Sequence, residues 1–75
     1  MPTLLNQDGF KFFFYANEHK TIHIHVMYGD DFAKIELNDI RVVQSYLKQK
    51  DLKKALDIIK ENRDDFIRRW NEWFD

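Results

Sequence analysis

The fold is set by residues 22–37, which run Ile22-His23-Ile24-His25-Val26-Met27-Tyr28-Gly29-Asp30-Asp31-Phe32-Ala33-Lys34-Ile35-Glu36-Leu37. Apolar and polar side chains alternate along both halves of this stretch, which is typical of strands with one apolar and one polar face. Gly29-Asp30 is a turn dipeptide between the two halves. The stretch therefore predicts a strand over 22–28, a tight turn, and a second antiparallel strand over 32–37.

Parity decides the register of this hairpin, because residues directly opposite in an antiparallel pair share a face. A two-residue turn places Ile24 opposite Ile35 and builds a uniform apolar face. The polar-face pairs are then His23 with Glu36, His25 with Lys34, and Met27 with Phe32. A three-residue turn mixes apolar with charged side chains and is rejected. A four-residue loop keeps the two faces but pairs His25 with Glu36, so histidine and glutamate are neighbours in either case.

The remaining segments predict an α+β fold. Residues 10–15 form an aromatic run that predicts a strand before the hairpin, with either side of it able to face the core, and Asp8-Gly9 is expected to open the folded part. Residues 40–48 fit a fourth strand or a helix. From Asp51 onward the apolar residues follow helical spacing: Leu52, Leu56, Ile59, Phe66, Trp70 and Trp73. We expect one domain over residues 1–75, a three-stranded or four-stranded antiparallel meander followed by a long C-terminal helix on one sheet face.

Composition narrows the class of protein. A chain of 75 residues without cysteine must gain its stability from apolar burial, and an aromatic content of 16% suits that need. Twelve basic and 13 acidic residues give a net charge of −1, so no bulk attraction to nucleic acid or anionic membrane is expected. No stretch is apolar enough to span a membrane, and residues 1–7 lack the features of a signal peptide. We expect a cytoplasmic protein with no membrane partner.

The three histidines, His19, His23 and His25, are the candidate site. Residues two apart on a strand lie about 6.5–7 Å apart on one face, so two imidazoles can reach a common atom. With Glu36 or His19 as a third ligand they fit an open metal site. Without metal they fit general acid–base cleavage of RNA, in which Glu36 fixes a tautomer, Lys34 or Lys11 stabilises phosphate charge, and Phe13, Tyr15 or Phe32 stacks on bases. The third interpretation is a polar sheet face with no chemistry. We expect no cofactor and no bound metal.

Several motifs occur together along the chain: Gly9-Phe10-Lys11-Phe12-Phe13-Phe14-Tyr15, Asn17-Glu18-His19, His23-Ile24-His25-Val26, Gly29-Asp30, Ala33-Lys34 and Trp70-x-x-x-Phe74. They resemble the small bacterial family catalogued as domain of unknown function 4160, over nearly the whole chain. The chain departs from that family at Tyr46-Leu47-Lys48, where members usually carry a Gly-Phe-Ser-type turn. The resemblance implies a two-gene unit with another small domain, similar to toxin–antitoxin modules.

These observations lead to two functional hypotheses. The first is a protein-interaction component of a toxin–antitoxin-like pair, which binds a small protein partner, a second copy of itself or both, with RNA as a further candidate ligand. The alternative is a metal-independent ribonuclease or RNA-binding protein. The candidate catalytic residues are His19, His23, His25 and Glu36. The candidate substrate-binding residues are Tyr15, Asn17, Glu18 and Lys34, and the resemblance implies that Asn17, Glu18 and the three histidines form one polar motif.

Overall fold

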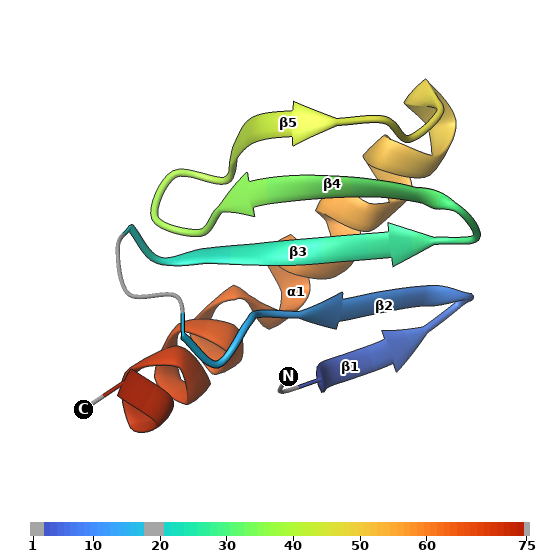
Figure 1. Ribbon diagram of the computed structural model, residues 1–75. Helices are drawn as coiled ribbons and strands as arrows, with labels where there is room; N and C mark the ends of the chain where they lie inside the picture. Colours follow the sequence, from blue (N-terminus) through green and yellow to red (C-terminus); the bar gives the residue numbers. More distant parts are fainter. Residues whose placement is uncertain (1–2, 18–20, 75) are drawn as a thin grey trace.

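Five antiparallel strands and one helix make up the computed structural model, which describes residues 3–17 and 21–74. The elements are β1 (Thr3–Gln7), β2 (Phe10–Phe13), β3 (His23–Tyr28), β4 (Asp31–Glu36), β5 (Arg41–Ser45) and α1 (Gln49–Phe74). Each strand pairs with the next one in the chain, so the sheet is a meander with the order β1-β2-β3-β4-β5. Helix α1 crosses one face of the sheet diagonally (Figure 1). The predicted α+β class and meander topology are confirmed.

The register of the β3–β4 hairpin is the one that parity predicts. Ile24 pairs with Ile35, His25 with Lys34, and the turn between the strands is Gly29-Asp30. Gly29 has a φ of 60°, and only this first central residue of the turn has a positive φ, as in a type II′ turn. Because the turn type matches the strand twist and the alternation matches the two faces, local sequence is sufficient to set this hairpin.

The sheet has more strands than the sequence predicts. Asp8-Gly9 does not open the folded part, because β1 precedes it and pairs with β2. Asp8 and Gly9 have φ values of 54° and 85°, so they form the central pair of a hairpin turn of type I′. The ambiguous segment 40–48 contains a strand, β5, and no helix. The prediction missed β1 because its sequence, Thr-Leu-Leu-Asn-Gln, lacks the alternation of a half-buried strand.

Both edges of the sheet carry a bulge. In β1, Leu4 is an extra residue between the partners of Phe13 and Phe12. In β5, Val43 is the extra residue between the partners of Lys34 and Ile35. Arg69 of α1 donates from Nη1 to the carbonyl oxygen of Leu4 at 2.8 Å. Bulges twist an edge strand and interrupt its row of hydrogen-bonding groups, so both edges are poor templates for a further strand.

The core lies between α1 and the face of the sheet that the helix crosses. Phe12, Ile24 and Ile35 are fully buried on the sheet side, and the helix contributes Ala55, Ile58, Ile59, Phe66 and Trp70. The rings of Phe12 and Phe66 lie 5.8 Å apart. The predicted helical stripe is thereby confirmed as the packing face of one continuous helix as far as Trp70, whereas Trp73 is 51% exposed. Over the described part of the chain, no helix combines the length and hydropathy that a membrane crossing requires.

Arg63 ties the helix to the end of β4. Its Nε donates to the carbonyl oxygen of Leu37 at 2.7 Å, and its Nη2 donates to that of Asn38 at 2.8 Å. These carbonyls belong to the turn 37–40, in which Ile40 adopts a φ of 53°, a conformation that β-branched residues rarely adopt. Ile40 also packs against the core, so the strained turn is held by burial and by the guanidinium together.

Candidate functional site

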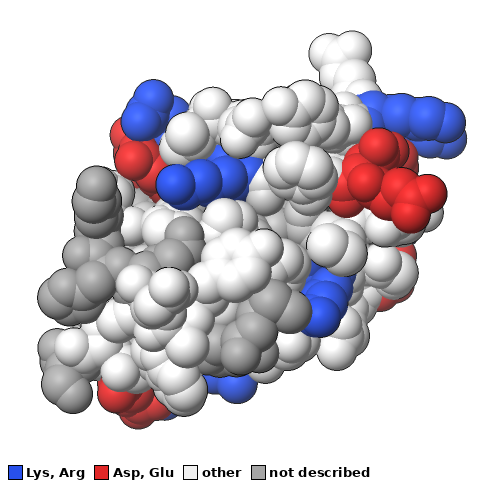
Figure 2. Space-filling view, in the orientation of Figure 1, with Lys and Arg blue, Asp and Glu red and all other residues white. Residues whose placement is uncertain are grey.

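The face of the sheet that α1 leaves uncovered is rich in large apolar side chains. Figure 2 looks onto this open face, because in the same orientation in Figure 1 the sheet lies in front of the helix. Tyr15, Met27, Phe32 and Tyr46 are 45%, 41%, 45% and 57% exposed. Uncharged atoms occupy most of the surface in this view. Contiguous exposed apolar surface on a small domain usually marks a binding site, so the open face is the candidate site.

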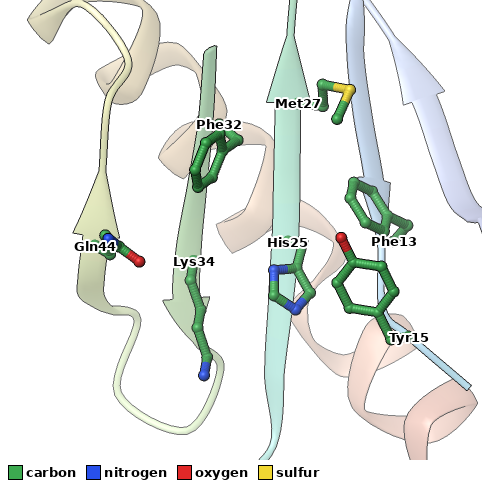
Figure 3. A pocket seen from close by; sticks show the side chains of 7 residues that line it. All are labelled: Phe13, Tyr15, His25, Met27, Phe32, Lys34 and Gln44. Carbon is green, nitrogen blue, oxygen red and sulfur yellow. The ribbon is translucent and has the colours of Figure 1, made fainter. Parts of the chain in front are cut away.

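A groove of about 320 Å³ lies on the open face. Its lining comes from strands β2 to β5 and from the segment after β2, as Figure 3 shows: Phe13, Tyr15, His25, Met27, Phe32, Lys34 and Gln44. Tyr46 lies beside it, with its ring 4.8 Å from that of Phe32 and its hydroxyl accepting a hydrogen bond from Gln44 at 2.7 Å. The groove therefore combines aromatic walls with a few polar groups, the composition of many ligand sites.

Phe13 is a buried residue of the open face. It is 3% exposed because other open-face side chains cover it. The His25 ring stacks on it at 5.5 Å, the Tyr15 ring meets it edge-on at 5.6 Å, and Lys11 Nζ lies 5.4 Å from its centroid. The sequence left open which side of residues 10–15 is the core. The structure shows that both sides bury aromatic rings, one under the helix and one under neighbours on the open face.

His23 and His25 lie side by side, as predicted, but only one of them faces the groove. Their rings are 5.0 Å apart, and His25 lines the groove. His23 is 4% exposed, so the prediction that both histidines stand on a solvated face is wrong for His23. Strand β2 ends at Phe13, opposite His25, so it does not extend alongside His23. There the ring of Trp70, from α1, packs 5.1 Å from the ring of His23. Nδ1 of His23 donates to the carbonyl oxygen of Thr21 at 2.7 Å.

Among the described residues, the charged side chains of the open face are the Glu36–Arg41 pair, Lys11 and Lys34. Glu36 lies opposite His23, as predicted; its Oε1 accepts a hydrogen bond from Nε of Arg41 at 2.9 Å and lies 2.8 Å from Nη2 of the same guanidinium. Arg41 was not predicted, because it belongs to the strand that the sequence left ambiguous. Lys34 lies opposite His25 and lines the groove. The structure therefore places Lys34 beside His25 and gives Glu36 a cationic partner of its own.

The other predicted site residues do not all lie in the groove. Tyr15 lines the groove, whereas Asn17 is exposed outside it. Glu18 and His19 lie outside the described residues. Within residues 3–17 and 21–74, no three His, Asp or Glu side chains are grouped closely enough to hold a metal ion. Sequence reasoning did not assign Met27 to the site, although parity with His25 would have found it, and no sequence signal pointed to Gln44.

The fold and the site define a small α+β protein whose meander is covered by one helix and exposes an aromatic face. The chain belongs to the family described as Domain of unknown function (DUF4160), whose family model matches residues 9–71. This confirms the resemblance drawn from the sequence motifs. Comparisons with curated proteins and with solved structures found no match. Of the sheet, the family match contains β2 to β5, and β1 lies before it.

Proposed function

We propose that this protein is an interaction module that binds a small protein partner through its open face, as one component of a two-gene, toxin–antitoxin-like unit. The observation that carries the proposal is the set of large exposed side chains in and beside the groove: Tyr15, Met27, Phe32 and Tyr46. Aromatic residues and methionine are enriched at protein interfaces, because they bury large area for little lost conformational entropy. A partner that covers these side chains buries apolar surface on the open face, as α1 does on the opposite face.

The edges of the sheet are weaker candidates for partner binding. An added strand needs a regular row of free backbone groups, and the bulges at Leu4 and Val43 interrupt that row on both sides. A partner that docks onto the open face needs no such row of backbone groups. The bulges therefore support the open face, and not strand addition, as the mode of partner binding.

The test is to coexpress the protein with the small protein encoded by the second gene of the proposed unit and to measure their affinity by calorimetry. The double variant Phe32→Ser/Tyr46→Ser removes two exposed rings, and we expect binding at least about tenfold weaker, since buried aromatic anchors dominate interface energies. Trp73→Ser is the matched control, because Trp73 is 51% exposed but lies at the end of α1. A complex that the double variant leaves intact would show that the open face is not the interface.

A second candidate function, RNA binding or metal-independent RNA cleavage, is supported by one observation. His25 lines the groove together with Lys34 and Tyr15, so an imidazole, a cation and an aromatic ring meet at one place. An imidazole can transfer a proton and a nearby ammonium can stabilise phosphate charge. His23 is buried, so His25 is the histidine of this pair that a ligand in the groove would reach.

Cleavage of a labelled short RNA in the presence of a chelator tests this candidate. A ribonuclease of this kind should lose at least about a hundredfold in rate in His25→Ala, the usual range for removing a general acid or base. Wild-type protein that cleaves no faster than His25→Ala would remove the catalytic hypothesis.

A further inference from the structure

The described residues of the open face carry a net positive charge, which the whole chain does not. The net charge of the chain is −1. On the open face the carboxylate of Glu36 is neutralised by Arg41, and within the described residues neither Lys11 nor Lys34 forms an ion pair. Figure 2 shows basic atoms within the largely uncharged surface and acidic atoms toward its margins. The charge of this face therefore favours a partner surface of negative charge.

The two lysines flank an apolar centre. Phe13 forms the β2 side of the groove (Figure 3), and Lys11 Nζ lies 5.4 Å from its ring. Met27 and Phe32 stand on neighbouring strands, and Lys34 extends along the sheet next to His25 (Figure 3). A volume of about 320 Å³ is at the low end of ligand sites, which suits one large side chain. The geometry fits an apolar side chain in the centre with carboxylates on either side.

A second copy of this chain is a poor occupant. Two copies that met through the same face would form an isologous interface, in which each residue meets its counterpart or the residues around it. Lys11 and Lys34 of one copy would then lie near the lysines of the other, and like charges across an interface oppose binding. The charge of the open face therefore points to a different chain.

Single-stranded RNA is also disfavoured as the main occupant. Its affinity rises with the number of phosphates that Lys and Arg neutralise. Within the described part of the chain, the open face offers Lys11 and Lys34, while Arg41 pairs with Glu36. Two cations match two carboxylates of a peptide better than they match the continuous charge of a nucleic acid.

We propose that the open face binds an acidic segment of a partner protein, which places one large apolar side chain among Phe13, Met27 and Phe32 and a neighbouring carboxylate on Lys34. This inference rests on the proposed interaction function and names the chemistry of the partner. The apolar anchor supplies most of the binding energy, and the carboxylates supply orientation and a dependence on ionic strength.

The test is selection of peptides from a random displayed library on the wild-type protein. The recovered peptides should carry an aromatic or large aliphatic residue flanked by Asp or Glu. The most frequent peptide is then titrated by fluorescence polarisation. Lys34→Glu should weaken its binding at least about tenfold, Lys34→Gln should weaken it less, and added salt should weaken wild-type binding. Lys60→Glu is the matched control, since it makes the same charge change at an exposed position of α1.

Several results would overturn the inference. Recovery of no peptide, or of peptides without acidic residues, excludes an acidic segment, as does Lys34→Glu binding as tightly as wild type while circular dichroism shows it folded. A uridine-rich oligonucleotide that displaces the peptide and binds more tightly makes RNA the occupant. The proposed function fails separately: if Phe32→Ser/Tyr46→Ser weakens partner binding and Lys34→Glu does not, the interface stands and only its acidic partner is wrong. If neither variant has an effect, both proposals fail.

Discussion

The two faces of this sheet carry similar aromatic side chains but differ in what covers them. On the helix face, Phe12 is fully buried and its ring lies 5.8 Å from that of Phe66. On the open face, the rings of Phe32 and Tyr46 are 4.8 Å apart and remain 45% and 57% exposed. The described part of the chain has one helix, which crosses one face only (Figure 1). Hydrophobicity alone therefore does not separate core from binding surface in this protein, because the position of α1 decides it.

The strongest test of this contrast is a substitution that creates a cavity on the helix face. Phe12→Ala removes a fully buried ring, and we expect the free energy of unfolding to fall by about 3–5 kcal/mol, the range for buried Phe→Ala changes. A domain of this length has roughly 4–11 kcal/mol in total, so the variant should be close to unfolding. Urea denaturation followed by circular dichroism measures the loss. A decrease below about 1 kcal/mol would contradict the assignment of the core.

Phe13 sharpens the contrast, because it belongs to the open face and yet is 3% exposed. Its cover is a single layer formed by Lys11, Tyr15 and His25. This layer can relax more easily than the helix, so Phe13→Ala should cost less than Phe12→Ala, about 2–3 kcal/mol. The same denaturation experiment gives the value. Equal losses for the two variants would mean that the two faces are equally well packed.

Arg63 tests how firmly the helix is held over its face. Arg63→Ala removes two charge-assisted hydrogen bonds, to the carbonyls of Leu37 and Asn38, and should lower the free energy of unfolding by about 1–2 kcal/mol. Arg68→Ala is the matched control, because Arg68 forms exposed ion pairs with Asp65 and Glu72 within the helix. The control should leave the denaturation midpoint nearly unchanged. If both arginine variants behave alike, the link between helix and sheet contributes little.

Phe32 should show the smallest effect on stability. Phe32→Ser replaces a side chain that is 45% exposed, so we expect a change in the free energy of unfolding within about 0.5 kcal/mol. Thermal denaturation at two protein concentrations checks this and also reports any self-association. A large loss of stability would mean that the open face is part of the core, and the contrast between the two faces would then fail.

The register and the faces of the central hairpin were predictable from sequence. Alternation along residues 22–37 and the Gly29-Asp30 turn are local signals, and together they allow one pairing. The helical stripe from Leu52 to Trp70 was equally clear, since its spacing repeats over many turns. The position of His25 next to Lys34 followed from the same parity. Local patterns alone were therefore sufficient to predict this part of the site.

The remaining features depend on contacts between distant segments. β1 and β5 lack a clear period of their own, and their identity as strands comes from pairing with β2 and β4. The burial of His23 depends on Trp70 of α1, and the groove needs Gln44 of β5. No local pattern reports such neighbours, because they are brought together only when the sheet and helix pack.

Periodicity and turn chemistry act between near neighbours, so the amino-acid sequence was enough to specify the α+β class, the central hairpin and the packing stripe of the helix. Which aromatic rings are core and which are surface was settled only by the packing of α1 on the sheet. Burial depends on what lies above a side chain, and in the described part of this protein the helix can lie above only one of two similar faces.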